Sequence, residues 1–239
     1  MKITDMHCHV LPGVDDGPAT MDEAVETLRS AYEQGIGNMI VTPHFHPGRY
    51  VVTASQIMEG VRQLQRRINA EGIDIHLFPG QECYYYSGLV GQLDAGNALT
   101  MNGTKYVLVE FDTETQYSAI TSAIRELRMS GYRPIIAHFE RYRCLYQHRE
   151  RLEELRENGA LLQMNLDALR ERGSLFRPNI WRRLITNGYV DFLGSDTHGM
   201  KFRPLHIKRA MEWLETDVDP DLMARIMNGN IGKLIKEKP

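Results

Sequence analysis

The first residues able to do chemistry are His7 and His9, which stand one residue apart at the end of a short apolar run. Side chains alternate between the two faces of a strand, so both imidazoles point the same way and Cys8 points the other. Two adjacent imidazoles can bind one divalent metal. A lone His-x-His is also typical of two surface histidines, so its meaning depends on the rest of the chain.

Similar residues follow the later predicted strands, each at the point where the strand ends. They are Asp16 in the loop after the first strand, His44 after the second, Glu82 after the third, Glu110 after the fourth, His138 after the fifth, and Asp196 and His198 after the seventh. The carboxyl ends of parallel strands converge on one face of a barrel, where active sites lie. With His7 and His9, these residues predict a metal site on that face.

The types of ligand indicate which metals would bind. Imidazole and carboxylate without thiolate suit manganese, iron, zinc or cobalt, and the set is too rich in nitrogen for calcium or magnesium. The predicted ligands are too many for one ion but enough for two or three, provided that a carboxylate such as Glu82 bridges. A water between two metals ionises near neutral pH and becomes a nucleophile, and the remaining positive charge suits a phosphate dianion.

The elements that must position these residues alternate along the chain. Strands are expected at 2–6, 38–42, 73–79, 106–111, 133–137, 161–164 and 191–194, and helices at 20–35, 55–71, 118–130, 148–158, 178–187 and from 205 onward, with Asn230 as a break. Residues 83–103 are expected to hold an aromatic run, a short helix and a turn. Because short apolar strands separated by helices form parallel sheets, we predict one α/β domain over 1–239. A (β/α) barrel is the first choice and an open doubly wound sheet the second.

Composition narrows the function classes. The chain has 239 residues and a formal net charge of −3, without a long basic run, so a nucleic-acid-binding function is not expected. The apolar runs are too short to cross a membrane, and the N-terminus shows no secretory leader. The three cysteines are far apart and are expected to be reduced thiols. A soluble cytoplasmic enzyme is the expectation.

Two arginines follow proposed ligands by a few residues. Arg141 comes after His138 and Arg203 after His198, so both are expected on the catalytic face. A guanidinium fork matches the oxygens of a phosphate group in two-toothed fashion. The arginines are therefore predicted to bind phosphate and to act in catalysis.

Together these motifs resemble the PHP (polymerase and histidinol phosphatase) superfamily. The opening His-x-His-x-Leu-Pro-Gly-x-Asp-Asp-Gly, the block His138-Phe139-Glu140-Arg141-Tyr142 and the pair Asp196 and His198 followed by Arg203-Pro204 resemble one branch. That branch comprises the bacterial manganese-dependent protein-tyrosine phosphatases of the capsule and exopolysaccharide CpsB/CapC type. The resemblance covers almost the whole chain and implies a distorted (β/α)7 TIM-like barrel that holds three metals.

The resemblance also implies which residues bind each metal. His7, His9, Glu82 and Asp196 would hold the first metal, Glu82, Glu110 and His138 the second, and Asp16, His44 and His198 the third. Arg141 and Arg203 would hold the phosphate. The implied reaction is hydrolysis of phosphotyrosine by a metal-bridging hydroxide, with a tyrosine-rich tail of a capsule-regulating kinase as the protein substrate.

Other functions stay open at this point. A small-molecule PHP phosphatase, such as one for histidinol phosphate, would use the same ligands. A phosphodiesterase acting on nucleic acid is disfavoured by the acidic charge balance. A non-catalytic metal-binding regulatory module is disfavoured by the complete ligand set. The oligomeric state and the native metal are not predicted.

Several further residues have weaker signals. Cys8 resembles the nucleophile of a Cys-x5-Arg loop, but the sixth position after it is Val14, so thiolate catalysis is not expected. His46 is interpreted as a residue at the lip of the site or behind the ligands. The aromatic run 84–86 could line the mouth of the site or pack in the core, and Asn165 could support a ligand from behind.

Overall fold

Short strands alternate with helices in the computed structural model, which describes residues 3–170, 173–174 and 177–235. The strands are β1 (Ile3–Cys8), β2 (Ile36–Val41), β3 (His44–His46), β4 (Tyr50–Val51), β5 (His76–Pro79), β6 (Glu82–Tyr84), β7 (Tyr106–Glu110), β8 (Arg133–Ile136), β9 (Leu161–Asn165), β10 (Gly173–Ser174), β11 (Arg177–Pro178) and β12 (Phe192–Gly194). The α-helices are α1 (Met21–Glu33), α2 (Ala54–Ala70), α3 (Leu89–Asp94), α4 (Tyr117–Met129), α5 (Arg143–Tyr146), α6 (Arg149–Glu157), α7 (Ile180–Thr186), α8 (Lys208–Asp217), α9 (Pro220–Ala224) and α10 (Gly232–Ile235). Short turns of other helix types are η1 (Met101–Gly103), η2 (Phe139–Arg141), η3 (Leu166–Leu169) and η4 (Arg225–Gly229).

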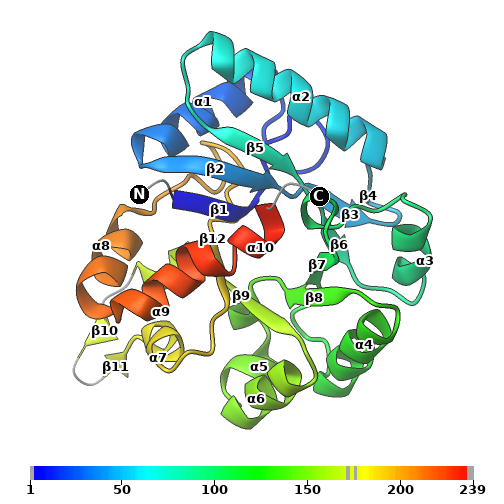
Figure 1. Cartoon of the computed structure of the whole chain (residues 1–239), viewed down its shortest axis with the longest axis vertical. Coiled ribbons are helices and arrows are strands. Elements are labelled where there is room, and N and C mark those ends of the chain that lie inside the picture. Colours follow the sequence, from blue (N-terminus) through cyan, green and yellow to red (C-terminus); the bar gives the residue numbers. More distant parts are fainter. Residues whose placement is uncertain (1–2, 171–172, 175–176, 236–239) are drawn as a thin grey trace.

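Apart from the separate β10–β11 hairpin, the strands form a curled, mixed sheet in two hydrogen-bonded parts (Figure 1). One part has the order β12-β9-β8-β7-β6-β3-β4, parallel except for the β3–β4 hairpin, and the other has the parallel order β1-β2-β5. β1 also meets the chain just after β12, because the His9 amide donates to the Thr197 carbonyl (2.9 Å) and the Asp196 amide to the His7 carbonyl (2.8 Å). The two parts thus curve around a common interior.

The longer helices lie around the outer face of this curl (Figure 1), and α1 and α2 each bury one apolar side. The residues predicted to form the inner faces of the first two helices are all buried: Ala24, Leu28 and Ala31 in α1, and Ile57, Val61, Leu64 and Ile68 in α2. Apolar side chains at this helical spacing drive a helix onto a sheet, since most helix stability in a protein comes from such packing. Among the described residues, no helix is long and apolar enough to cross a membrane.

Helix α1 begins at the predicted cap. The Thr20 side chain accepts a hydrogen bond from the Glu23 amide (3.3 Å), but the Glu23 carboxylate accepts from the Ala19 amide (2.9 Å) and not from Thr20. The reciprocal capping box occurs instead at the start of α2, between Thr53 and Gln56. Both caps satisfy amides that the first helical turn leaves without a partner.

A small apolar cluster fills the concave side of the sheet. It consists of Met6, Ile40, Met101, Tyr106, Leu108, Ile135, Ala137, Phe192, Ile231 and Leu234. Through the last two of these residues, α10 and the turn before it cover the concave side near the amino ends of the strands, and α10 lies in the middle of the curl in Figure 1. The carboxyl ends are left to polar residues. The register of β1 shifts between Asp5 and Cys8. His7 lies within this irregular stretch and reaches the polar end together with His9, whereas its neighbour Met6 packs in the cluster.

The structure departs from the sequence expectation in three places. The segment after the second strand, expected as a loop over 43–48, contains β3 and leads into β4, and Glu82 begins a strand, β6, where only a loop was expected. The helical tail breaks at Val218 and Asp219 as well as near Asn230, because Asp219 caps a new helix there. Residue 2 of the first predicted strand and the part of the predicted helical tail beyond residue 235 lie outside the described residues.

Close packing between β12 and β1 provides a stability prediction. A Cβ at Gly194 would lie 2.7 Å from the His7 Cβ, so Gly194→Ala must push the two strands apart. We expect a loss of about 1–3 kcal/mol in the free energy of unfolding, as for an overpacked core. Urea denaturation measures it.

The matched control is Gly91→Ala. Gly91 lies in α3, and nothing lies within 4 Å of the Cβ that the substitution adds. An alanine there should leave stability unchanged or raise it by about 0.5–1 kcal/mol, because glycine is the poorer helix former. A Gly194→Ala midpoint equal to that of the unsubstituted protein would contradict the proposed contact.

Candidate metal centre

The nine predicted ligands come together in space, from the ends of β1, β2, β5, β7, β8 and β12 and the segments that follow them. Glu82, fully buried at the start of β6, is at the middle of the group. Its Oε2 atom lies 3.3 Å from Nε2 of both His7 and His9. The same oxygen lies 3.1 Å from His44 Nδ1, and Oε1 lies 2.9 Å from His138 Nε2. One carboxylate thus contacts four imidazoles.

The remaining carboxylates surround this centre. Asp16 Oδ1 lies 3.4 Å from His44 Nε2 and 3.3 Å from His198 Nε2. Glu110 Oε1 lies 3.5 Å from His138 Nε2. Three groups have ligand atoms that all lie within 4.8 Å of one another: His9, Asp16, His44 and His198; His7, His9 and Glu82; and His44, Glu82 and Glu110.

Three of the histidines are held from behind through Nδ1. The contacts run from His7 to Gln163 Oε1 (3.0 Å), from His9 to Asp15 Oδ2 (2.8 Å) and from His198 to the Asp196 carbonyl (2.9 Å). In a neutral ring, an Nδ1 that donates to an oxygen carries the proton, which leaves the lone pair of Nε2 to face the centre. Histidines that bind metals are oriented in this way by outer hydrogen bonds.

The carboxylates also change the acidity of the histidines. Burial lowers the pKa of His9, but the Asp15 carboxylate outweighs it and raises the pKa to about 9. For His44, burial is again outweighed, by Asp16 and other carboxylates, and the pKa rises to about 11. For His138, burial is outweighed by hydrogen bonds with Glu110 and Glu82, and the pKa rises to about 10. Protons therefore balance the buried carboxylates at neutral pH, and a divalent cation would have to compete with them.

Two of the nine residues have strained backbones. His138 has a φ of 31° and Asp196 a φ of 53°, both in the left-handed region that non-glycine residues rarely adopt. Each such residue costs about 1–3 kcal/mol and persists only where the surroundings hold it. The surroundings here do so: the His138 amide donates to Gln163 (2.7 Å), and the Asp196 amide donates to His7.

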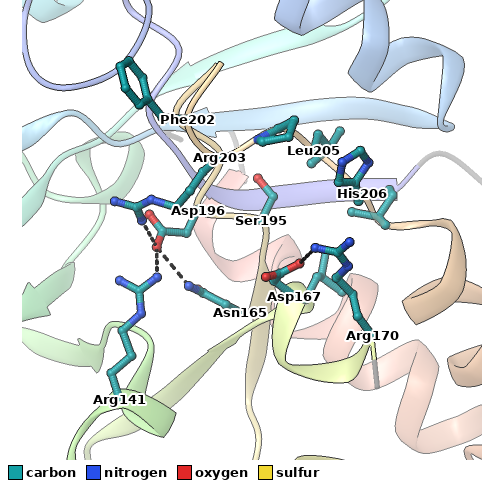
Figure 2. Close-up of a pocket in the computed structure, with 13 residues that line it drawn as sticks. Arg141, Asn165, Asp167, Arg170, Ser195, Asp196, Phe202, Arg203, Leu205 and His206 are labelled. Atoms are coloured by element: carbon teal, nitrogen blue, oxygen red, sulfur yellow. Dashed lines mark hydrogen bonds and ion pairs between the residues drawn. The ribbon is translucent and has the colours of Figure 1, made fainter. Parts of the chain in front are cut away.

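The two predicted arginines meet at Asp196 (Figure 2). Arg141 Nη2 lies 2.6 Å and Arg203 Nη1 2.7 Å from Asp196 Oδ2, and Asn165 Nδ2 donates to the same oxygen at 2.9 Å. The other oxygen, Oδ1, lies 3.6 Å from His7 Nε2. Asp196 therefore joins the histidine cluster to a pair of partly exposed guanidinium groups.

Sequence reasoning missed two supporting residues. Asp15 accepts from His9 and from the His44 amide (3.1 Å), although only its neighbour Asp16 was proposed. Gln163 contacts His7, accepts from the His138 amide and donates to Asn165 Oδ1 (2.9 Å). A second aspartate in the loop and a polar residue two positions before Asn165 on a buried strand were the available signals.

The cysteines lie apart from this chemistry. Cys8 packs in the outer apolar layer, where its thiol donates to the Ile40 carbonyl (3.4 Å), so it faces away from the histidines as predicted. Burial raises the pKa of the Cys8 and Cys83 thiols, which keeps both protonated. Neither has the environment of a reactive thiolate.

The residues fit divalent metals. Glu82 Oε2 is buried and accepts no well-formed hydrogen bond from the described residues, although three imidazole nitrogens surround it. A buried carboxylate oxygen left in this state is costly unless a cation satisfies it. The structure thus contains candidate metal-binding clusters of histidine, glutamate and aspartate.

Comparison with solved structures defines the class of fold. A mutant of the organophosphorus hydrolase from Deinococcus radiodurans shares the fold with a TM-score of 0.58 at 14% identity, covering 98% of this chain and 93% of that chain. A crystal structure from the pair YwqE of Bacillus subtilis and CpsB of Streptococcus pneumoniae, described as unique metal-dependent tyrosine phosphatases, gives a TM-score of 0.87 at 31% identity. That match covers 99% of this chain and 96% of that chain.

Sequence comparison then gives the family. The chain belongs to the CpsB/CapC family of capsular polysaccharide synthesis, whose model matches residues 3–236. It is 33% identical over 221 residues to the tyrosine-protein phosphatase YwqE of Bacillus subtilis, covering 91% of this chain and 86% of the relative. It is 26% identical over 238 residues to the tyrosine-protein phosphatase CpsB of Streptococcus agalactiae, covering 97% and 98%.

The support that Asp15 gives to His9 and His44 can be tested. Removing it by Asp15→Ala leaves the His9 ring unheld, and loss of such an outer partner costs about 10–100-fold in metal affinity. We expect this loss in a competition titration of manganese against a chelator.

Asp22→Ala is the control for Asp15→Ala. Asp22 is exposed on α1, where its carboxylate accepts from Arg67. Its removal should leave metal affinity unchanged. Equal metal affinity for the Asp15 and Asp22 variants would show that Asp15 does not position the ligands.

Proposed function

We propose that this protein is a metal-dependent phosphoric monoester hydrolase that removes phosphate from phosphotyrosine in proteins. The observation that carries the proposal is the convergence of Arg141 and Arg203 on Asp196, beside a buried cluster of histidines and carboxylates. Relatives across nearly the whole chain are named tyrosine-protein phosphatases. A partner of opposite charge, the phosphate group, suits the two guanidinium groups.

We further propose that two or three divalent transition metals, manganese above all, bind at this centre. The first would be held by His7, His9, Glu82 and Asp196, the second by Glu82, Glu110 and His138, and the third by Asp16, His44 and His198. When bound, the metals supply Lewis-acid stabilisation and activate water as the nucleophile. Two of the three groups of ligand atoms share Glu82, and the other contains Asp16, His44 and His198 together, which supports this assignment. The contact between Glu82 and His138 supports it as well.

The chain's own residues bind and orient the phosphate. Arg141 and Arg203 are partly exposed, with 37% and 44% of their side chains accessible, so their guanidinium groups can meet a ligand from solvent. Asn165 and the two arginines hold Asp196 in a single position. Charge that develops on the phosphate oxygens in the transition state would strengthen the arginine contacts.

The same site favours an aryl ester. A tyrosine leaving group has a pKa of about 10, well below that of an alkyl alcohol, and so needs less help from a general acid. The nine proposed ligands include the carboxylates and histidines that contact the centre, and this leaves few groups to protonate a poorer leaving group. Phosphotyrosine therefore suits the site better than histidinol phosphate, the principal alternative.

Other parts of the proposal concern the whole molecule. We propose that the two parts of the curled sheet form a seven-stranded barrel, in which β2 continues as β3 and β5 as β6, and that the chain acts as one catalytic domain. A kinase that regulates capsule or exopolysaccharide synthesis is the proposed substrate, because the family is one of capsular polysaccharide synthesis. A cytoplasmic location stays a prediction.

Substitution of the arginines tests phosphate binding. Arg141→Ala and Arg203→Ala should each lower kcat/KM by about 10²-fold or more, the usual worth of one charge-stabilising group. Metal content, measured by elemental analysis, should stay the same. Arg170→Ala is the control. Arg170 lines one pocket together with Arg141 and Arg203, but its guanidinium group pairs with Asp167 (Figure 2). Normal turnover by both the Arg141→Ala and the Arg203→Ala variants would refute a role of these arginines in phosphate binding.

Metal removal and substrate choice test the reaction itself. Protein loaded with manganese should hydrolyse phosphotyrosine peptides well ahead of phosphoserine peptides and histidinol phosphate, and a chelator should abolish the activity. Cys8→Ser and Cys83→Ser should keep most of it, because neither thiol takes part. Phosphate release measures each rate.

Three results would contradict this function. Activity that persists after a chelator has removed all metal from the protein would exclude a metal mechanism. A trapped phosphocysteine would indicate thiolate catalysis. Equal rates on phosphotyrosine and histidinol phosphate would favour a small-molecule phosphatase.

A further inference from the structure

A second layer of side chains lies directly outside the proposed ligands. His46 follows His44 by two residues on β3, and Tyr84 follows Glu82 by two residues on β6. Residues two apart on a strand share a face, so this layer stands over the ligand layer at about 6.6 Å, the rise of two residues. The strand register also places Tyr84 beside the proposed ligand Glu110.

The rings of this layer are in contact. The centroids of His46 and Tyr84 lie 4.2 Å apart, with the ring planes at 31°. The Tyr84 hydroxyl donates to Asp112 Oδ2 at 2.6 Å, and His46 Nδ1 lies 3.1 Å from the Pro47 carbonyl. Each ring is therefore held by a polar contact as well as by its neighbour.

A third ring comes from the other strand of the hairpin. Tyr50 on β4 pairs with His46 in the antiparallel register. Its ring lies 5.4 Å from the ring of His44 and almost parallel to it, at 12°. The Arg49 guanidinium lies 5.0 Å from the Tyr50 ring centroid. We call His46, Tyr50 and Tyr84 the aromatic rim, and all three are only partly buried.

The other tyrosines of the run 84–86 face elsewhere. The Tyr85 ring packs 5.6 Å from Phe111, and its hydroxyl donates to Glu126 on α4. Tyr86 lines a separate apolar pocket with Phe45. Of the three, only Tyr84 stands above the ligands, which shows that the rim is a particular set and not a general aromatic surface.

We propose that the aromatic rim is the subsite for the phenyl ring of the substrate and sets a preference for aryl over alkyl phosphates. This inference rests on the proposed function, in which the phosphate group sits among the ligands and the two arginines. The ester oxygen then leads outward, and the next atoms of an aryl phosphate are those of its ring. The height of the rim above the ligand layer is comparable with the length of a phosphophenyl group.

Ring contacts suit this task. Aromatic groups gain from offset or tilted contact beyond the burial of their area, and rings already held in place lose little freedom when a ligand binds. An alkyl phosphate offers no ring and would leave the rim in water. The main alternative contact for the substrate ring is Phe202. It precedes Arg203 in the segment after β12 and is 81% exposed (Figure 2).

The test measures binding to full-length, manganese-loaded protein by calorimetry. The probes are phenylphosphonate and methylphosphonate, which share the anionic head and differ in the ring. Tyr84→Leu and His46→Leu should each lower the affinity ratio of the two probes by about 3- to 10-fold, the usual worth of one aromatic contact. Methylphosphonate affinity and metal content should not change.

Tyr84→Phe is the matched control, because it keeps the ring and loses only the bond to Asp112. It should retain the ratio of the unsubstituted protein. An unchanged ratio in the double variant of Tyr84 and His46 would overturn the proposal. A lower affinity ratio in Phe202→Ala, with the ratio unchanged in the rim variants, would also overturn it, because the substrate ring would then lie beside Phe202.

Failure of the underlying function has a different signature. If methylphosphonate binds manganese-loaded protein no more tightly than metal-free protein, and Arg141→Ala does not weaken it, the phosphate site itself is wrong and the aromatic rim proposal falls with it. If methylphosphonate binding depends on metal and on Arg141 but the probe ratio ignores the rim, only the rim proposal fails.

Discussion

The burial of Glu82 is the constraint on which the rest of the site depends. Burial raises the pKa of a carboxyl group, yet contacts with His7, His138 and His44 hold the pKa of Glu82 well below its usual range. A buried charge is tolerated only when opposite charge and hydrogen bonds compensate for its lost hydration. The strands that carry these histidines must therefore end around one point. The curl of the sheet provides this, because parallel strands all present their carboxyl ends to the same side.

Residues behind the histidines fix the positions of the rings that surround Glu82. Asp15 and Gln163 fix the rings of His9 and His7, and Gln163 also binds the amide of His138, whose backbone is strained. Such strain is stored at functional sites and is maintained by the packing around them. Here the His138 amide donates to Gln163 and the Asp196 amide donates to the His7 carbonyl, so hydrogen bonds hold both strained residues.

The sequence was sufficient to predict which side chains gather, since spacing and strand alternation determine it. His7 and His9, and the residues that end later strands, share an edge because parallel strands do. It was not sufficient to predict the supporting residues. Asp15 and Asp16 are adjacent residues of the same type, and the conformation of the loop decides which side chain contacts His9. The β3–β4 hairpin was missed because Pro43, Pro47 and Gly48 are typical of a loop, whereas pairing with β6 makes the segment a strand.

Asp196 links the histidine side of the site to the arginine side through one carboxylate. One of its oxygens faces His7 and His9, and the other accepts from Arg141, Arg203 and Asn165. Positive charge on either side stabilises the same carboxylate, which keeps its pKa low despite burial. Because one residue with a strained backbone carries both contacts, the geometry of the two halves is coupled through a single short segment after β12.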